Sequence, residues 1–92
     1  MSERCTIEVT IINTLGLHAR PAMEFADIAG GYQSSVSVKK DGIDPIDGKS
    51  IMHIMLLAAT KGTALEITAE GPDAEACCAA LKALVEAGFN ED

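Results

Sequence analysis

The sequence predicts an α+β fold of two layers, with elements in the order βαββαβα. Three observations support this prediction: stretches where apolar and polar residues alternate, stretches where apolar residues recur at helical spacing, and breaks containing glycine or proline between them. Strands with one apolar face need cover on that face only, so helices are expected on one side of the sheet. The 92 residues suit a single domain, 1–92, with one modest core.

The first half of the chain predicts a strand, a helix and two further strands. Residues 4–12 alternate as a half-buried strand, and residues 19–29 carry a narrow apolar stripe at helical spacing. The glycine pair at 30–31 predicts a left-handed cap that ends this helix. Residues 33–40 alternate again, and a short edge strand is expected over 43–46, which includes a proline.

The second half predicts a short apolar element, a strand and a last helix. Ser50 is a good N-cap for the apolar segment 51–59, which is a short helix or a buried strand. Residues 65–70 alternate as a strand. Asp73 is the expected N-cap of the last helix, and the acidic tail 90–92 is expected to be loose.

Charge and composition exclude several classes of function. The net charge is -7, from 14 acidic and 7 basic residues, so nucleic acid and anionic membrane surfaces are not expected partners. Three cysteines, an odd number without metal-ligand spacing, indicate neither a disulfide framework nor a metal site. With no apolar run of bilayer length and no secretory signal, we expect a cytoplasmic monomer without a cofactor.

His18 stands where the first strand pattern ends and helical spacing begins. Pro21 follows closely, and proline is tolerated in the first turn of a helix. The free N–H groups of a helix N-terminus, together with its dipole, form an anion site suited to phosphate. Arg20 is placed to clamp an oxyanion. The alternative is an ordinary surface histidine at a helix start.

Two motifs carry a resemblance to a known family. Residues 16–22, Gly-Leu-His-Ala-Arg-Pro-Ala, resemble the phosphohistidine motif of the HPr family, the small phosphocarriers of the bacterial phosphoenolpyruvate-dependent phosphotransferase system. Residues 48–55 are similar to the regulatory-serine region of that family. The resemblance covers nearly the whole chain. It implies an open-faced sandwich, in which three helices cover one face of a four-stranded antiparallel sheet.

The resemblance also implies roles for residues of the first motif. His18 is implied as the phosphoryl acceptor through Nδ1, Arg20 as the phosphate-stabilising partner, and Gly16 and Pro21 as residues that shape the turn. Enzyme I is the implied donor, and a histidine of an EIIA domain is the implied acceptor. Leu15 departs from the pattern, since many carriers have a polar residue there.

The second motif suggests regulation. Ser50 is either an N-cap only or, by resemblance, also a site of regulatory phosphorylation by HPr kinase/phosphorylase. A phosphate on a helix N-terminus is tolerated locally, but it adds about two negative charges beside any surface that binds partners.

An apolar docking patch is implied beside the histidine. By resemblance, Ile51, Met52 and Met55 are exposed, and they are joined by Met23 and Ala19 of the first helix. Methionine suits such a surface because it repacks against different partners. The alternative is that the first three residues are core. The core stripe of the short helix is, however, expected to be filled by three other residues, Ile54, Leu57 and Ala58.

The most specific expectation is therefore a phosphocarrier, an intermediate of phosphoryl transfer rather than a stand-alone enzyme. The alternative is a mainly regulatory module that acts through protein–protein binding. The pathway stays open between sugar transport and nitrogen regulation, because Lys49-Ser50 resembles HPr whereas residues 87–92 resemble NPr, the nitrogen-branch paralogue. A metal pair of His53 with His18 lacks a third ligand and is not expected.

Overall fold

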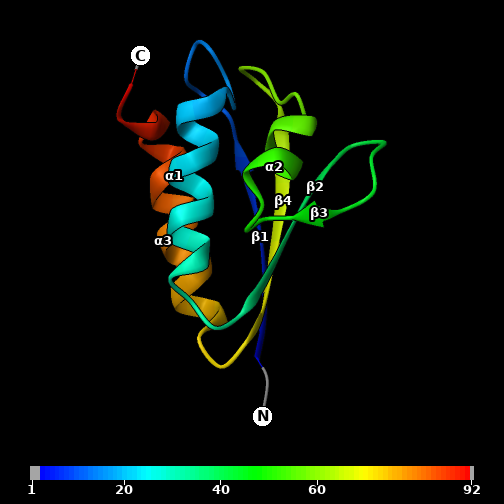
Figure 1. Ribbon diagram of the computed structural model, residues 1–92, viewed down its shortest axis with the longest axis vertical. Coiled ribbons are helices and arrows are strands. Elements are labelled where there is room, and N and C mark those ends of the chain that lie inside the picture. Colours follow the sequence, from blue (N-terminus) through cyan, green and yellow to red (C-terminus); the bar gives the residue numbers. More distant parts are fainter. Residues whose placement is uncertain (1–2, 92) are drawn as a thin grey trace.

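The computed structural model describes residues 3–91. Figure 1 shows a sheet with helices packed against it. The elements, in chain order, are β1 (Glu3–Thr10), α1 (Ala19–Gly30), β2 (Ser35–Lys40), β3 (Ile46–Asp47), α2 (Ile51–Leu56), β4 (Ala64–Gly71), α3 (Ala74–Glu86) and a 3-10 turn, η1 (Gly88–Asn90). The predicted order βαββαβα is confirmed.

The four strands form an antiparallel sheet in the order β1-β4-β2-β3. β4 lies inside the sheet, where Ile67 pairs with Ile7 of β1 on one side and with Val38 of β2 on the other. β3 is an edge strand with only two paired positions. It begins later than predicted, because Pro45 has no N–H to donate to a sheet partner.

The helices pack against one face of the sheet, as predicted. α1 buries Phe25 and its neighbours one turn away, Ala22 and Ala29, while α3 buries Leu81 and Val85 at the same helical spacing. The opposite face of the sheet is polar. This sidedness follows from the period of two in each strand and of 3.6 in each helix.

The end of α2 differs from the prediction. The helix stops at Leu56, and the chain reverses at Ala58, whose φ is +51°. Ile54 and Leu57 are buried as predicted, but Ala58 is exposed and Ala59 takes the core position. A left-handed residue changes which side chain faces inward, and the uniformly apolar residues 54–59 give no signal of that reversal.

Two helix-end predictions also need correction. Gly31 follows α1 with φ -78° and ψ -4°, so no left-handed cap forms there. Asp73 does occupy the N-cap position of α3, but its carboxylate makes no cap hydrogen bond. It accepts instead from Ser34 Oγ at 2.5 Å and from the backbone N–H groups of Gln33 and Ser34, both at 2.9 Å. The hydroxyl of Ser34, followed by the N–H of Gln33, holds the pKa of Asp73 below its usual value.

The cysteines are free thiols that pack in or beside the core, which agrees with their interpretation as small apolar residues. Burial raises the pKa of Cys78 to about 12, so its reactive thiolate form is suppressed at neutral pH. Within residues 3–91, no helix has both the length and the apolar character needed to cross a bilayer.

Candidate functional site

His18 is the N-cap of α1 and lies where the loop after β1 enters that helix. Its backbone is extended, with φ -76° and ψ -173°, and its carbonyl accepts the first helical hydrogen bond from Ala22 N at 3.0 Å. Its side chain does not cap the helix. The N–H groups of the first turn, which begins with Ala19 and Arg20, have no intrahelical acceptor. Pro21 is buried in this turn, where its missing N–H costs nothing.

Gly16 shapes the loop that leads to His18. Its φ is +67°, and a Cβ added there would lie 2.3 Å from the carbonyl oxygen of Ala59. The next residue, Leu17, donates its N–H to that same oxygen at 2.9 Å and is itself buried. This close approach of two backbone segments requires glycine, and it fixes the start of α1 against the loop after α2.

Replacing Gly16 with alanine is expected to lower the free energy of unfolding by about 3 kcal/mol. The left-handed backbone costs a residue with a Cβ about 1–2 kcal/mol, and the clash adds the loss of the Leu17 hydrogen bond, worth about 1 kcal/mol. Gly42→Ala is the matched control, because Gly42 has φ +79° but nothing within 4 Å of an added Cβ. Urea unfolding followed by circular dichroism measures both variants. Equal losses in the two variants would contradict the steric argument.

The side chain of His18 is hydrogen-bonded to Glu91, close to the C-terminus. Its Nε2 lies 2.8 Å from Oε1 of Glu91, and the two side chains are 36% and 18% exposed. Asn13, which is buried, donates from Nδ2 to the same Oε1 at 2.8 Å and to the Gly16 carbonyl at 2.8 Å. The hydrogen bond from His18, followed by that from Asn13, lowers the pKa of Glu91. The prediction of a loose acidic tail is therefore wrong for Asn90, which belongs to η1, and for Glu91, while Asp92 lies outside the described residues.

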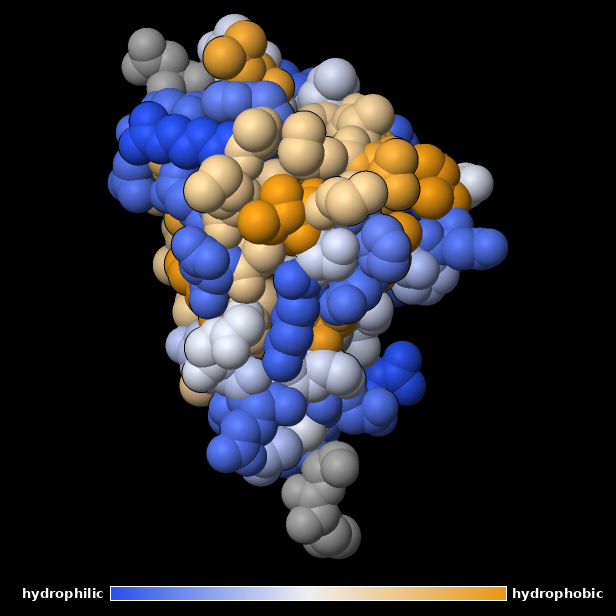
Figure 2. All heavy atoms as spheres, in the orientation of Figure 1, coloured by the Kyte–Doolittle hydropathy of each residue, from blue (hydrophilic) through white to orange (hydrophobic). Residues whose placement is uncertain are grey.

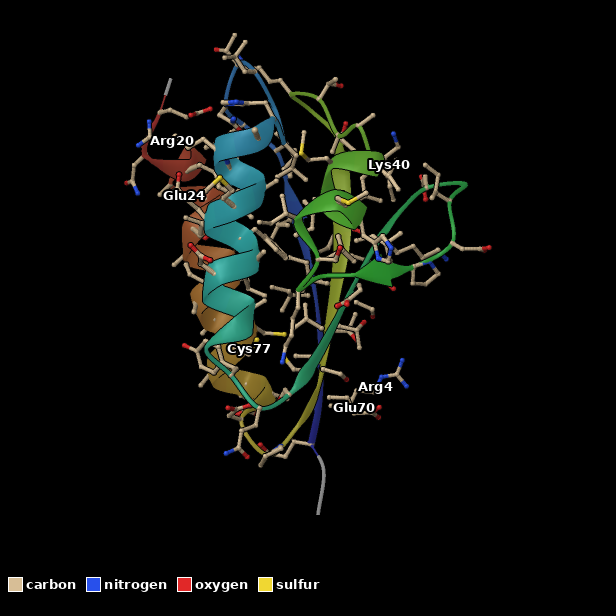
Figure 3. The ribbon with its side chains drawn as sticks, in the orientation of Figure 1. Arg4, Arg20, Glu24, Lys40, Glu70 and Cys77 are labelled. Atoms are coloured by element: carbon tan, nitrogen blue, oxygen red, sulfur yellow. The ribbon has the colours of Figure 1, made fainter. Side chains whose placement is uncertain are left out.

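Arg20 is the most exposed member of this group. Its side chain is 68% exposed, and its Nε lies 3.4 Å from Oε1 of Glu24, one turn further along α1. Figure 3 shows both side chains on the side of the structure that carries the C-terminal segment. Glu24 is half-buried, but the guanidinium of Arg20 is mostly exposed, so the pair contributes little and Arg20 can leave Glu24 for a stronger anion.

Large apolar side chains are exposed on α1 and α2, which pack against each other. Figure 2 shows apolar residues gathered in a band across the upper half of the face formed by these helices. The predicted members are Met23, Ile51, Met52 and Met55, which are 51%, 38%, 75% and 44% exposed. The interpretation of the last three as core is therefore wrong. Ala19 is exposed as well.

Four exposed large apolar residues of the described part of the chain were missed: Leu56 of α2, Leu15 and Ile12 in the loop before α1, and Ile43 in the loop between β2 and β3. Leu56 falls in the run 51–59, which is apolar except for the exposed His53, and it was not among the residues that the resemblance implied as exposed. The name docking patch is kept below for the predicted residues Ala19, Met23, Ile51, Met52 and Met55.

Ser50 is the N-cap of α2, as predicted. Its Oγ accepts from the backbone N–H of His53 at 3.2 Å. The residue is half-buried, and Met52 stands two positions further along the chain. Among residues 3–91, no group of three or more His, Cys, Asp or Glu side chains is arranged to hold a metal ion.

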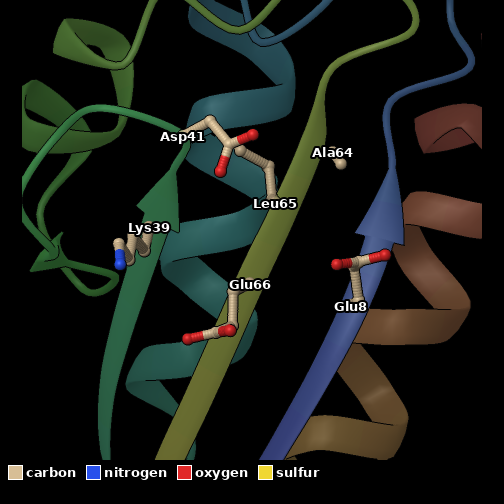
Figure 4. A pocket seen from close by; sticks show the side chains of 6 residues that line it. All are labelled: Glu8, Lys39, Asp41, Ala64, Leu65 and Glu66. Atoms are coloured by element: carbon tan, nitrogen blue, oxygen red, sulfur yellow. The ribbon is translucent and has the colours of Figure 1, made fainter.

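A shallow hollow lies on the opposite, uncovered face of the sheet (Figure 4). Its lining is mostly charged and comes from β1, β4 and the end of β2: Glu8, Lys39, Asp41, Ala64, Leu65 and Glu66. None of the residues placed at the helix start or in the docking patch lines it.

Comparisons with known proteins agree on one family. A family model described as the PTS HPr component phosphorylation site matches residues 5–87. The chain is 46% identical over 85 residues to phosphocarrier protein HPr of Pseudomonas aeruginosa, covering 92% of this chain and 94% of that protein. It is 36% identical over 92 residues to phosphocarrier protein NPr of Escherichia coli K12, covering all of both chains.

Solved structures show the same likeness. HPr-C-His from Thermoanaerobacter tengcongensis matches with a TM-score of 0.90 and 39% identity, over 96% of this chain and 98% of that chain. A phosphocarrier protein HPr from Bacillus anthracis matches with a TM-score of 0.84 and 39% identity, over 89% and 96%. The likeness thus extends over nearly the whole chain, in sequence and in fold.

Proposed function

Because the chain belongs to the HPr family and is a phosphocarrier of the phosphotransferase system, we propose that His18 takes a phosphoryl group from phospho-Enzyme I and passes it to a histidine of an EIIA domain. The observation that carries this proposal is the placement of His18. Its ring is partly exposed at the N-terminus of α1, with Nε2 engaged by Glu91, and Nδ1 makes no hydrogen bond among residues 3–91. We place this relay in the cytoplasm.

The proposed reaction is a direct exchange of phosphoryl between nitrogen atoms. The Nδ1 lone pair of His18 forms a bond to phosphorus while the N–P bond of the donor histidine breaks, and the electron pair of that bond returns to the donor ring. Such transfer depends mainly on positioning and on stabilising the charge of the phosphoryl oxygens. The N–H groups of Ala19 and Arg20 at the start of α1 supply donors, and the helix dipole favours the negative charge.

Arg20 completes the site in this proposal. Its guanidinium exchanges the exposed contact with Glu24 for the phosphoryl oxygens, which offer a doubly charged partner in bidentate geometry. The docking patch is proposed to bind Enzyme I and EIIA in turn. Flexible methionines suit one surface that meets several partners briefly.

Incubation with phosphoenolpyruvate and Enzyme I tests this function. We expect one acid-labile phosphate per chain by intact mass, and no phosphate when Enzyme I is left out. Adding a panel of EIIA domains is expected to discharge the carrier with at least one of them, which would also identify the pathway branch. A folded protein that stays unphosphorylated beside an active Enzyme I from the same organism would contradict the proposal.

A second, regulatory role is proposed for Ser50, as a site of phosphorylation by HPr kinase/phosphorylase. Its Oγ sits at the start of α2, two residues from the highly exposed Met52. A phosphate there would bring about two negative charges to the edge of the docking patch. Those charges would have to be desolvated in a complex, so binding of Enzyme I would weaken.

Replacing Ser50 with aspartate is expected to slow phosphorylation by Enzyme I at least tenfold, because an unpaired charge at an interface costs more than 1.4 kcal/mol. Ser50→Asn is the matched control, since asparagine caps a helix as well as aspartate but is neutral. Both variants are expected to keep the wild-type free energy of unfolding within about 0.5 kcal/mol. Equal phosphorylation rates of the two variants would show that a negative charge at position 50 does not regulate phosphorylation by Enzyme I.

A further inference from the structure

We propose that Glu91 is a positioning residue for the carrier reaction: its carboxylate holds the imidazole of His18 with the proton on Nε2 and the lone pair on Nδ1. The inference rests on the proposed role of His18. Glu91 lies outside the two motifs at 16–22 and 48–55, in the C-terminal stretch that resembles NPr, and is 73 residues along the chain from His18.

The tautomer follows from what each atom can do. An ionised carboxylate only accepts hydrogen bonds, so a ring nitrogen 2.8 Å from Oε1 must carry the proton. The orientation of the Asn13 amide is fixed in the same way. It faces two acceptors, Oε1 of Glu91 and the carbonyl of Gly16, each at 2.8 Å. Its NH₂ group therefore points to both. One carboxylate oxygen thus accepts from two donors, and the second donor is buried and fixed.

An unusual turn after α3 places Glu91 beside His18. Gly88, Phe89 and Asn90 have φ values of +63°, +56° and +58°, three left-handed residues in succession. Phe89 is fully buried and anchors the turn in the core. Glu91 then donates its own N–H to the carbonyl of Gly88 at 3.1 Å. A left-handed phenylalanine persists only where packing enforces it, so the buried side chain of Phe89 sets the position of Glu91.

The contact has a consequence in both directions of transfer. When Nδ1 forms its bond to phosphorus, the proton stays on Nε2 and the ring gains positive charge, which the carboxylate of Glu91 stabilises. When the phosphoryl group moves on, the N–P bond breaks, its electron pair returns to Nδ1, and the ring departs as neutral imidazole. No proton has to enter or leave the ring in either step.

Among residues 3–91, two charged or titratable groups face Glu91, namely His18, which is hydrogen-bonded, and Arg20, which acts through its positive charge. Both favour the ionised carboxylate, in agreement with its lowered pKa. The contribution of the contact is therefore complete above the ordinary pKa of a glutamate and is lost only as pH falls through the lower value in the folded protein. Experiments at neutral pH or above thus meet the ionised form.

The test uses Glu91→Ala and Glu91→Gln, with Glu86→Ala as the control, since Glu86 is an exposed glutamate at the end of α3. The first readout is the ring ¹⁵N spectrum of His18 above neutral pH, which needs no phosphorylation. Wild type and Glu86→Ala are expected to show an Nε2–H tautomer whose proton exchanges slowly enough to be observed. Glu91→Ala is expected to show fast exchange and mixed tautomers, and glutamine, which keeps an acceptor oxygen, is expected to restore the tautomer.

The second readout is the rate of phosphorylation by Enzyme I. We expect a loss of roughly tenfold in Glu91→Ala, the lower end of the loss that follows removal of the orienting partner of a metal-bound histidine, with partial recovery in Glu91→Gln. A wild-type ring that already shows mixed tautomers, or a Glu91→Ala variant with the wild-type rate, would overturn the proposal. Absence of phosphate on wild type would instead refute the role of His18, and the ring spectrum would still report the contact with Glu91.

Discussion

Replacing His18 with alanine is expected to abolish phosphorylation by phosphoenolpyruvate and Enzyme I, with a loss of at least a thousandfold in rate. No other nitrogen nucleophile stands at the N-terminus of α1 in the part of the chain that the structure describes. The substitution leaves the fold intact, because the ring is partly exposed and makes no helix cap. Intact mass under mild alkaline conditions, which preserve phosphohistidine, measures the outcome.

His53→Ala is the matched control for this prediction, because His53 is the other histidine of the chain and lies on the exposed side of α2. It is expected to accept one phosphate as wild type does. If His18→Ala still accepted phosphate, or if only His53→Ala failed to accept it, the phosphoryl acceptor would not be His18. The second result would assign that role to His53 of α2.

Replacing Phe89 with alanine is expected to lower the free energy of unfolding by about 3–5 kcal/mol and to release Glu91 from His18. Phe89 is fully buried although its φ is +56°, so its side chain holds a turn that the backbone alone disfavours. Without the ring, the turn loses its anchor, and the observable Nε2 proton of His18 is expected to disappear through exchange.

Phe25→Ala separates these two effects. Phe25 is equally buried, in α1, and its loss is expected to cost a similar 3–5 kcal/mol. Phe25 belongs to α1 and not to the C-terminal turn, so the contact between Glu91 and His18 is expected to survive at a temperature where both variants are folded. If the Nε2 proton of His18 stays observable in Phe89→Ala, the C-terminal turn does not depend on the side chain of Phe89.

Much of the fold follows from local pattern. The alternation around Ile7 and Ile67 and the helical spacing around Phe25 and Leu81 each state which side of an element is buried, and the folded chain buries those sides. Ser50 was predictable as an N-cap because a hydroxyl before an apolar run has a local partner three residues on. His18 at the start of α1 followed in the same way, from a strand pattern that gives way to helical spacing.

The remaining features depend on contacts between distant segments. The bond from His18 to Glu91 joins residues 73 positions apart, and it requires three left-handed residues of which only one is glycine. Asn13 was seen only as a break after the first strand, although its amide connects the loop to Glu91. A buried asparagine before the motif and a phenylalanine close to the C-terminus were the available signals. The contact of Arg20 with Glu24 depends on the rotamer of the Arg20 side chain, and the periodicity of the sequence does not encode that rotamer.

The phosphorylated atom is the most direct test of the proposed carrier chemistry. Protein labelled with ¹⁵N-histidine is charged by phosphoenolpyruvate and Enzyme I, and the ring nitrogen bonded to phosphorus is identified by NMR. We predict a single phosphate on Nδ1 of His18, with the proton of that ring on Nε2 beside Glu91. A phosphate on Nε2 of His18, or on His53, would contradict the account.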